Sequence, residues 1–259
     1  MISANIQNIT GFDISTLVKF KPPRAHCPKC LALLKSIPRM NNQGEIVCPV
    51  CDFKVAIYPH SLIDSYEQYR IFFRNQGLYL DFNNLDEHCR QLALIANEMQ
   101  YKPLDFPPLK ALLASLNTAQ QFIHITSYGI SPEFLLTLKL LSYRLAVRGI
   151  ISVPVEQSWL LSELSNYAIE GANIQLKVIS ACRQSWNLYP HQKLIIIDGL
   201  MAFKGSANLT LTGWRKAARG YDEVEIITDI EKVITLHNCY FSPIWANLSE
   251  YGETINIAA

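Results

Sequence analysis

The stretch 191–208 constrains the fold of this chain more than any other part of its sequence. Two apolar runs, 194–197 and 200–203, flank the dipeptide Asp198-Gly199, which is typical of tight hairpin turns. The pattern therefore predicts two antiparallel strands joined at this turn. Because a hairpin brings the start of its first strand beside the end of its second, the two ends of the stretch are expected to meet.

Five residues at the open end of this hairpin carry chemistry suited to a phosphate. His191 and Lys193 stand two positions apart, and an extended chain directs both side chains to one face. Gly205 allows the backbone to approach a ligand closely, and Ser206 and Asn208 follow it. A histidine can act as a nucleophile, while lysine, serine and asparagine donate hydrogen bonds to phosphate oxygens. The set predicts phosphoryl transfer, with His191 attacking phosphorus while the donors neutralise the developing charge.

The spacing of these residues, H-x-K-x4-D-x6-G-S-x-N, resembles the motif of the phospholipase D superfamily, and every fixed position is matched. The order of elements expected over 105–248 is similar to that of one domain of this family. The resemblance implies a covalent phosphohistidine at His191 and no need for a catalytic metal. Asp198 completes the motif and is counted with its catalytic residues, although its place at a turn indicates a structural role.

Members of this family also carry a downstream acid that hydrogen-bonds the catalytic histidine. Glu223, at the start of the expected strand 223–228, fits this position best and would orient the imidazole of His191. The loop before it is longer than in compact members of the family. The supporting acid could therefore be Asp222 or Glu225 instead.

Five further positions are candidates for contacts with the substrate: Lys204, Gly205, Trp214, Arg215 and Lys216. Lys204 precedes Ser206 by two positions, which on a straight strand places both side chains on one face. The run 214–216 follows the motif closely, so its indole ring could stack on a base and its two cations could contact phosphate. The same run could equally form the surface of a helix.

A second complete motif does not occur, because no other histidine in the sequence begins a His-x-Lys pair. One histidine cannot easily act as the nucleophile and also as the acid that protonates the leaving oxygen. Single-motif members of the family resemble homodimers whose two copies meet at a two-fold axis. The resemblance therefore implies a homodimer in which His191 of each subunit contributes to one shared site.

Four cysteines form two C-P-x-C pairs, Cys27 with Cys30 and Cys48 with Cys51. The spacing C-x2-C-x17-C-x2-C lies in the range of four-thiolate zinc sites and predicts a zinc ribbon. So small a segment buries little core, and a structural zinc ion would therefore supply much of its folding free energy. Such a ribbon can stabilise a fold, bind nucleic acid or recruit a protein partner.

These patterns divide the chain into four parts. An N-terminal arm covers 1–23, the zinc ribbon 24–60, a helical connector 61–104 and a phospholipase D-like catalytic domain 105–259. The connector has helical spacing of its apolar residues but no pattern that indicates chemistry.

Strands and helices alternate in the last part, which favours an α/β fold with a mixed, largely buried β-sheet flanked by helices. The expected helices are 62–73 and 84–100 in the connector and 109–118, 132–148, 157–169, 211–218 and 230–248 in the catalytic domain. The expected strands are 122–127, 150–155, 174–179, 191–197, 200–204 and 223–228.

Charge and hydropathy narrow the function further. The net charge of +1 argues against a globally basic nucleic-acid binder, but the first 60 residues hold seven Lys or Arg against three acids. No apolar run approaches the ~18 residues of a membrane helix, and the start resembles no secretory signal, so a cytoplasmic protein is expected.

The expected function is a nuclease that cleaves DNA or RNA. A phospholipid phosphodiesterase, acting on cardiolipin or phosphatidyl groups, and a catalytically quiet nucleic-acid-binding module are the alternatives.

Overall fold

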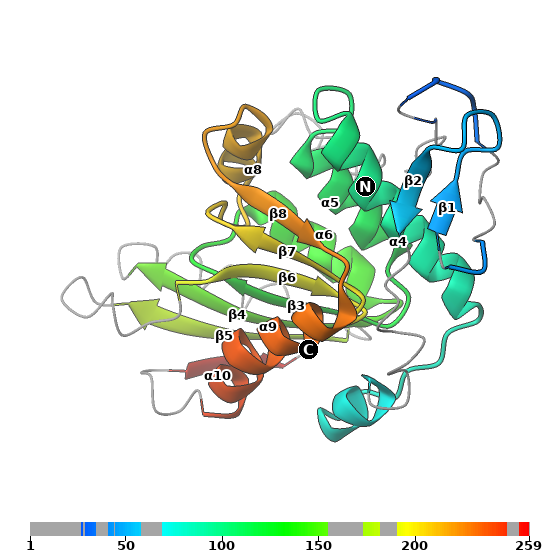
Figure 1. Cartoon of the computed structure of the whole chain (residues 1–259). Helices are drawn as coiled ribbons and strands as arrows, with labels where there is room; N and C mark the ends of the chain where they lie inside the picture. The colour runs from blue at the N-terminus through cyan, green and yellow to red at the C-terminus, as the bar shows by residue number, and fades with distance from the viewer. Residues whose placement is uncertain are drawn as a thin grey trace, which may run out of the picture.

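The computed structural model describes residues 27, 29–34, 41–43, 45–57, 69–154, 173–181, 191–247 and 254–258 of the 259-residue chain. The predicted arm 1–23, the predicted helix 157–169 and most of the predicted helix 62–73 lie outside the described residues. The described chain forms a twisted sheet with helices on both faces and a small two-stranded unit beside it (Figure 1).

The main sheet is mixed, which confirms the predicted α/β class. Its strands are β3 Phe122–Ser127, β4 Ala146–Pro154, β5 Ile174–Ala181, β6 Lys193–Ile197, β7 Met201–Gly205, β8 Val224–Ile227 and β9 Thr254–Ala258. Within the described chain they lie in the order β8-β7-β6-β3-β4-β5-β9. The pairs β3/β4 and β4/β5 are parallel, and the other four pairs are antiparallel.

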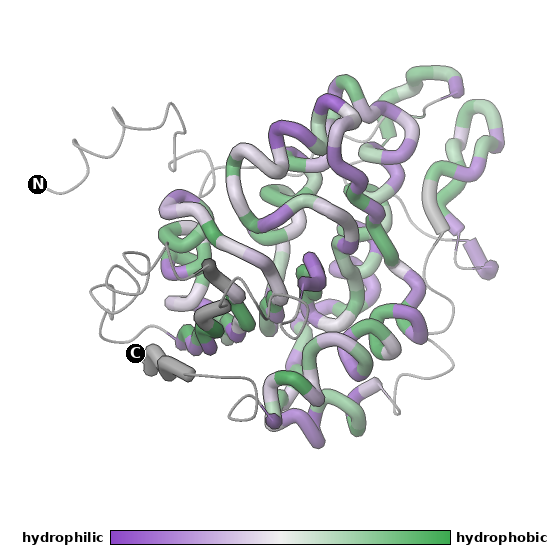
Figure 2. Tube along the Cα trace, turned by 90° about the vertical axis from the view of Figure 1, so that its left-hand side faces the viewer, coloured by the Kyte–Doolittle hydropathy of each residue, from purple (hydrophilic) through white to green (hydrophobic). Residues whose placement is uncertain are grey.

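Helices cover both faces of this sheet. They are α4 Leu85–Tyr101, α5 Pro108–Thr118, α6 Pro132–Ser142, α8 Leu211–Ala218, α9 Ile230–Tyr240 and α10 Ser242–Ala246, and residues 69–75 are also helical. Trp214 of α8 packs on Phe203 of β7, whereas His237 of α9 packs on His124 from the opposite face. All six residues of the central strand β3 are buried, as expected for a strand covered on both sides. Figure 2 shows hydrophobic and hydrophilic residues interleaved along the helices, as expected of helices that lie between a sheet and solvent.

The predicted helix 132–148 is wrong at its C-terminal end. Helix α6 ends at Ser142, and β4 begins already at Ala146. Gly149, which the sequence pattern placed just after a helix, lies inside this strand. A Cβ atom at Gly149 would lie 2.6 Å from Cδ2 of Leu176 on the neighbouring strand, so a larger residue there would force the Leu176 side chain to shift.

The predicted helix 230–248 is interrupted. Helix α9 ends at Tyr240, and α10 begins at Ser242 with Pro243 in its first turn. Proline lacks the backbone N–H that a continuous helix would need at this point, so a new short helix starts instead.

Strand β9, which pairs with β5, had no counterpart among the predicted elements.

Two buried histidines join the central strand to α9. Nδ1 of His124 lies 2.7 Å from Nε2 of His237, and Nδ1 of His237 lies 3.0 Å from Oγ of Ser242. The ring of His124 also stacks on Phe241, with 4.4 Å between centroids. Burial lowers the pKa of both imidazoles, and the guanidinium of Arg148 lowers them further. Both histidines are therefore neutral in the folded protein at pH 7.

Acidification is expected to destabilise the fold through this pair. The pKa of His237 is lowered from 6.5 to about 4, so its contribution to stability is complete above pH 6.5 and is lost as the pH falls towards 4. The free energy of unfolding should fall by about 3 kcal/mol from His237 alone, and His124 acts in the same direction. Urea unfolding at about pH 7, 5.5 and 4.5 measures this slope. His237→Asn should flatten it more than His191→Asn, whose side chain is exposed, and a slope unchanged by His237→Asn would contradict the assignment.

The cysteine-containing unit is a two-stranded antiparallel ribbon, with β1 at Glu45–Val47 and β2 at Lys54–Ile57. Its core includes Ile46 and Val55, and Ala93 and Leu94 of α4 pack into the same cluster. Other residues of α4, among them Leu92 and Ile95, belong to the core of the main domain. Helix α4 is therefore shared between the ribbon and the sheet domain.

Candidate active site

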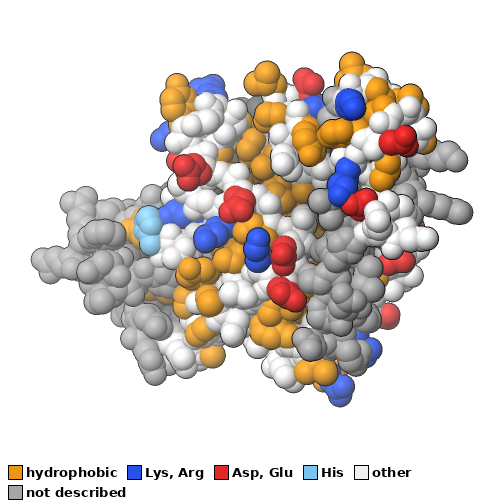
Figure 3. All heavy atoms as spheres, in the orientation of Figure 1, with side chains coloured by type: hydrophobic (Ala, Val, Ile, Leu, Met, Phe, Trp, Pro, Cys, Tyr) orange, Lys and Arg blue, Asp and Glu red, His pale blue; other side chains and the backbone are white. Residues whose placement is uncertain are grey.

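The hairpin of β6 and β7 gathers the predicted phosphate-binding residues at one end of the sheet. Lys193 pairs with Gly205 across the two strands. His191 lies two residues before Lys193, and Ser206 and Asn208 come just after Gly205. Figure 3 shows an exposed histidine at this end of the molecule, next to Lys or Arg side chains. His191 is the exposed histidine of the described chain, and His88, His124 and His237 are buried.

The histidine and the lysine of the motif touch each other. Nζ of Lys193 lies 2.7 Å from Nδ1 of His191 and donates to the carbonyl oxygen of His191 at 2.7 Å. Partial burial lowers the pKa of His191, and the adjacent ammonium lowers it further. The imidazole is therefore neutral near pH 7, which is the state that a nucleophile needs.

The serine of the motif fastens β7 to the start of β8. Its Oγ donates to Oδ1 of Asp222 at 3.2 Å and accepts from the backbone N–H of Glu223 at 2.9 Å. Burial lowers the pKa of Lys193, and the charge of Asp222 opposes this shift. Asp222 is thus the one of the three candidate acids whose carboxylate interacts with motif side chains in the described chain. The Glu223 side chain is exposed, and Glu223 contributes its backbone.

Asn208 and Trp214 each present a buried polar atom that finds no hydrogen-bond partner within the described chain, Oδ1 and Nε1 respectively. Gly213 packs against Asn208, because a Cβ atom at Gly213 would lie 2.9 Å from the Asn208 carbonyl oxygen. A buried polar atom without a partner is costly, so such atoms mark places where a water or ligand can bind.

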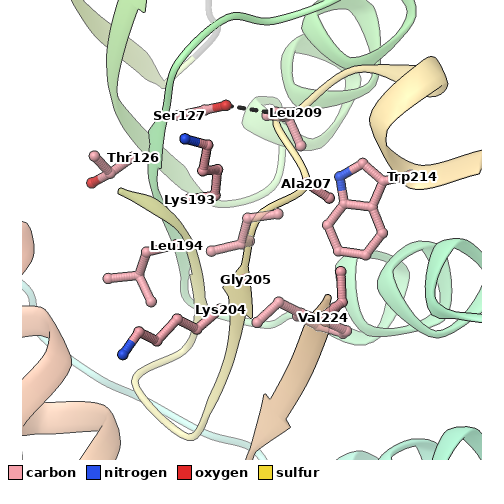
Figure 4. Close-up of a pocket in the computed structure, with 12 residues that line it drawn as sticks. Thr126, Ser127, Lys193, Leu194, Lys204, Gly205, Ala207, Leu209, Trp214 and Val224 are labelled. Atoms are coloured by element: carbon pink, nitrogen blue, oxygen red, sulfur yellow. Dashed lines mark hydrogen bonds between the residues drawn. The ribbon is translucent and has the colours of Figure 1, made fainter. Parts of the chain in front are cut away.

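A cavity of about 10 Å³ lies under the motif, which is room for about one water molecule (Figure 4). It is lined by Thr126, Ser127, Lys193, Leu194, Ile195, Phe203, Lys204, Gly205, Ala207, Leu209, Trp214 and Val224. A phosphodiester would not fit inside it. The described geometry leaves the open surface beside His191 and Ser206 as the place for a substrate.

Lys204 and Gly205, two of the predicted substrate contacts, each have structural contacts within the fold. The side chain of Lys204 points away from Lys193 (Figure 4), and its Nζ lies 5.6 Å from the ring centroid of Tyr240 on the α9 face. Side chains alternate between the two faces of β7 only up to Gly205, its last residue. Ser206 lies beyond that end, so the two-residue spacing does not place Lys204 and Ser206 on one face. Gly205 is needed for packing, since a Cβ atom there would lie 1.9 Å from the carbonyl oxygen of Glu223.

The run 214–216 lies on α8. Trp214 is 2% exposed and packs 5.8 Å from the ring of Phe203, so its faces are not open for stacking on a base. Arg215 and Lys216 are exposed in the last turn of the helix. Arg215 and Lys216 therefore form part of the surface of α8, where their charged groups are accessible to solvent.

Asp198 lies at the opposite end of β6 from His191 and is fully buried. Its carboxylate is 2.7 Å from Nε2 of His88 and accepts three backbone hydrogen bonds of 2.8 Å each. Those bonds come from Gln120, Gln121 and Phe122, which precede or begin β3. The structural role indicated by the turn is therefore what the contacts show, and Asp198 does not reach the phosphate-binding end.

Sequence reasoning missed the loop after β3. Ser127 accepts from the backbone N–H of Leu209 at 2.8 Å and donates to the carbonyl oxygen of Gly129 (Figure 4). Tyr128, the next residue, places its ring 4.9 Å from the ring of His191. Gly129, directly after a buried strand, indicates a loop at that strand end. The sequence does not indicate that this loop lies against His191.

The four ribbon cysteines are placed to hold a metal ion. Their Sγ atoms all lie within 4.8 Å of one another. The pairs Cys27–Cys51 and Cys30–Cys48 are each 3.6 Å apart, near the ~3.8 Å expected between thiolates arranged tetrahedrally around zinc. The two halves of the site also match in their backbone. Leu31 and Asp52, each directly after a pair, have φ of 59° and 55°, and their N–H groups donate back to Cys27 and Cys48.

A mixed sheet that presents His, Lys, Ser and Asn at one strand end is an arrangement suited to chemistry on a phosphodiester. A family model described as "Cardiolipin synthase, PLD-like domain" matches residues 112–245, just over half of the chain. The chain belongs to this phospholipase D-like family of phosphodiesterases. No protein of curated function matches its sequence.

Several solved structures are similar to the chain. Nuc from Salmonella typhimurium, titled a phospholipase D family member, is 19% identical over 57% of this chain and 93% of its own, with a TM-score of 0.40. NucT from Helicobacter pylori is 19% identical over 51% of this chain and 84% of its own, with a TM-score of 0.35. TrmBL2, titled an archaeal chromatin protein, is 18% identical over 59% of this chain and 51% of its own, with a TM-score of 0.35.

No helix in the described ranges combines the length and the apolar character that crossing a membrane requires.

Proposed function

We propose that this chain is a nuclease that cleaves a phosphodiester of DNA or RNA through a covalent phosphohistidine. The observation that carries the proposal is the exposed His191–Lys193 contact at the strand end where Ser206 and Asn208 follow the paired strand. A neutral imidazole beside hydrogen-bond donors is the arrangement that nucleophilic attack on a phosphodiester needs.

The reaction proceeds in two displacements at phosphorus. A ring nitrogen of His191 attacks, the bond from phosphorus to the leaving oxygen breaks, and that oxygen takes a proton from a general acid. A water molecule then attacks the phosphohistidine, gives its proton to the same group acting as a base, and frees His191. Lys193 and Asn208 bind the nonbridging oxygens, with the Ser206 hydroxyl beside them, and stabilise the charge that forms in each step.

The general acid is proposed to come from a second copy of the chain. Of the other histidines in the described chain, His124 and His237 bond to each other and His88 bonds to Asp198, and all three are buried. None of these can reach a substrate at His191. A two-fold axis that passes close to the open end of the β6–β7 hairpin would place His191 of both subunits in one site. A homodimer built on the outer edges of the sheet would leave them apart.

Structural zinc is proposed for the ribbon, because four thiolates at tetrahedral spacing suit this ion. The ribbon is also what favours nucleic acid over lipid. It packs on α4, and the first 60 residues are the basic part of the sequence. An excess of cationic side chains in this part of the sequence favours binding of a polyanion over a neutral ligand. A protein partner of the ribbon is the other use that such a unit allows.

A substrate panel tests the proposal. Labelled single-stranded DNA, duplex DNA and RNA, and cardiolipin vesicles are incubated with the protein, with and without a chelator, and with His191→Asn as the matched control. At least one nucleic acid should be cut, the cleavage should persist for as long as the ribbon stays folded, and vesicles should be untouched. The fold of the ribbon is checked by zinc content and circular dichroism.

The panel also separates the alternatives. Hydrolysis of cardiolipin without cleavage of any nucleic acid would establish a phospholipid phosphodiesterase instead. Binding of nucleic acid with no cleavage under any condition would indicate a catalytically quiet module. Cleavage that persists in His191→Asn would overturn the proposed mechanism.

A further inference from the structure

An aromatic ring lies against the reactive pair of the motif. The ring of Tyr128 is 4.9 Å from that of His191, centroid to centroid, with an angle of 47° between the planes. Nζ of Lys193 lies 6.0 Å from the same ring centroid, at the limit of a cation–π contact. Tyr128 is partly buried, so part of its side chain remains open to solvent.

The backbone fixes this ring to the other half of the motif. Ser127 bonds through its hydroxyl to the N–H of Leu209, and the N–H of Ser131 donates to the Leu209 carbonyl oxygen at 3.0 Å. Ile130 forms an isolated bridge to Leu209. Gly129 has a φ of 107°, a value that favours glycine, and this allows the tight loop. The loop that carries Tyr128 is therefore tied to the residue directly after Asn208.

A contact with the Tyr128 ring can hold His191 in place, because His191 lies just before the start of β6. It precedes Lys193, the first paired residue of β6, and so lies at the end of the strand and not within its paired part. A nucleophile displaced by about 1 Å can lose about 100-fold in rate. A ring beside the imidazole restricts its rotation and removes water from one side. The same ring attracts the Lys193 ammonium, on which the carboxylate of Asp222 also acts.

We propose that Tyr128 is a positioning residue, whose ring holds the His191 imidazole and the Lys193 ammonium in the orientation for attack on phosphorus. The inference rests on the proposed phosphodiesterase function of the same site. Its contribution comes from the ring and not from the hydroxyl group, because both contacts are made by the ring.

Substitution at Tyr128 tests this role. Tyr128→Leu should lower kcat on an oligonucleotide about 10- to 100-fold with a KM within about threefold of wild type, since binding donors are retained. Tyr128→Phe should restore most of the rate. Tyr79→Leu, at a tyrosine that is 77% exposed, is the matched control and should change neither value.

A second readout does not depend on catalysis. The pKa of His191 is followed by NMR through its imidazole C–H signal, which is assigned by its loss in His191→Asn. Because burial lowers this pKa, Tyr128→Leu should raise it towards 6.5 and Tyr128→Phe should leave it unchanged. If the leucine variant does not fold, Tyr128→Gln takes its place in both measurements.

The two readouts distinguish two kinds of failure. A wild-type rate in Tyr128→Leu together with an unchanged pKa of His191 would overturn the inference. A rise in that pKa in a protein without activity on any substrate would support the contact and count against the proposed function. A loss of rate in Tyr128→Phe as large as in Tyr128→Leu would also overturn it, because the hydroxyl would then be the part that acts.

Discussion

His191→Asn is expected to lower kcat by at least about 1,000-fold, because an amide cannot form the phosphohistidine on which both displacements depend. The side chain is exposed, and the contacts of His191 described above involve the surface side chains of Lys193 and Tyr128. The free energy of unfolding should therefore stay within about 0.5 kcal/mol of wild type. Single-turnover cleavage and urea unfolding of the same preparation measure the two effects.

Mixed dimers extend this test to the shared site. When wild-type and His191→Asn subunits are mixed and allowed to exchange, each site needs two intact histidines. Activity should then follow the square of the wild-type fraction, so an equal mixture should keep about one quarter of the activity. Independent sites would keep about one half.

The mixing procedure needs a control. Cys239→Ser changes an exposed cysteine on α9, and mixing it with wild type should leave the activity unchanged at every ratio. Linear dependence on the wild-type fraction for His191→Asn, or full activity in a protein that is monomeric by light scattering, would rule out the shared site.

The residues that the sequence placed well are those whose position depends on near neighbours. The Asp198-Gly199 turn fixes the pairing of β6 with β7, so Lys193 meets Gly205 without help from the rest of the chain. The two C-P-x-C pairs are also local, and the cysteines do gather. In both cases a short loop and a spacing rule determine the geometry.

The residues that the sequence placed poorly depend on distant partners. Gly149 looks like a helix end in the sequence, but it lies inside β4, beside the side chain of Leu176 on the next strand. Trp214 follows the motif closely, but it is buried because Phe203 and α6 cover it. Period and spacing describe one segment at a time, whereas burial is decided by the segments packed against it.

The same limit applies to the supporting acid. Glu223, Asp222 and Glu225 alternate around the start of β8, and a shift of one residue moves a side chain to the other face. The pairing of Gly205 with Val224 sets this register, and it leaves Asp222 beside the Ser206 hydroxyl. The sequence favours Glu223 because it starts the expected strand, but it does not contain the strand register that brings Asp222 to Ser206.

Asp198→Ala is expected to lower the free energy of unfolding by about 3–5 kcal/mol. This loss should exceed that of an alanine substitution at any other Asp or Glu of the described chain. The substitution removes the partner of His88 and leaves three backbone N–H groups without acceptors in a fully buried site. These N–H groups lie where β3 begins, so their contacts join the hairpin turn to the central strand. Tyr69 also donates to the backbone carbonyl oxygen of Asp198, which the substitution leaves in place.

Urea unfolding measures this loss against Asp105→Ala, which removes an exposed carboxylate and should cost less than about 0.5 kcal/mol. Asp198→Asn should fall between the two, since the amide oxygen still accepts hydrogen bonds while the amide NH2 faces a donor. If the motif aspartate bound substrate instead, Asp198→Asn would lose activity with little loss of stability. The opposite result is expected: the folded fraction of Asp198→Asn should cleave at a rate close to wild type, because the turn lies at the far end of β6 from His191. A loss below about 1 kcal/mol in Asp198→Ala would show that the buried pair with His88 does not hold the hairpin.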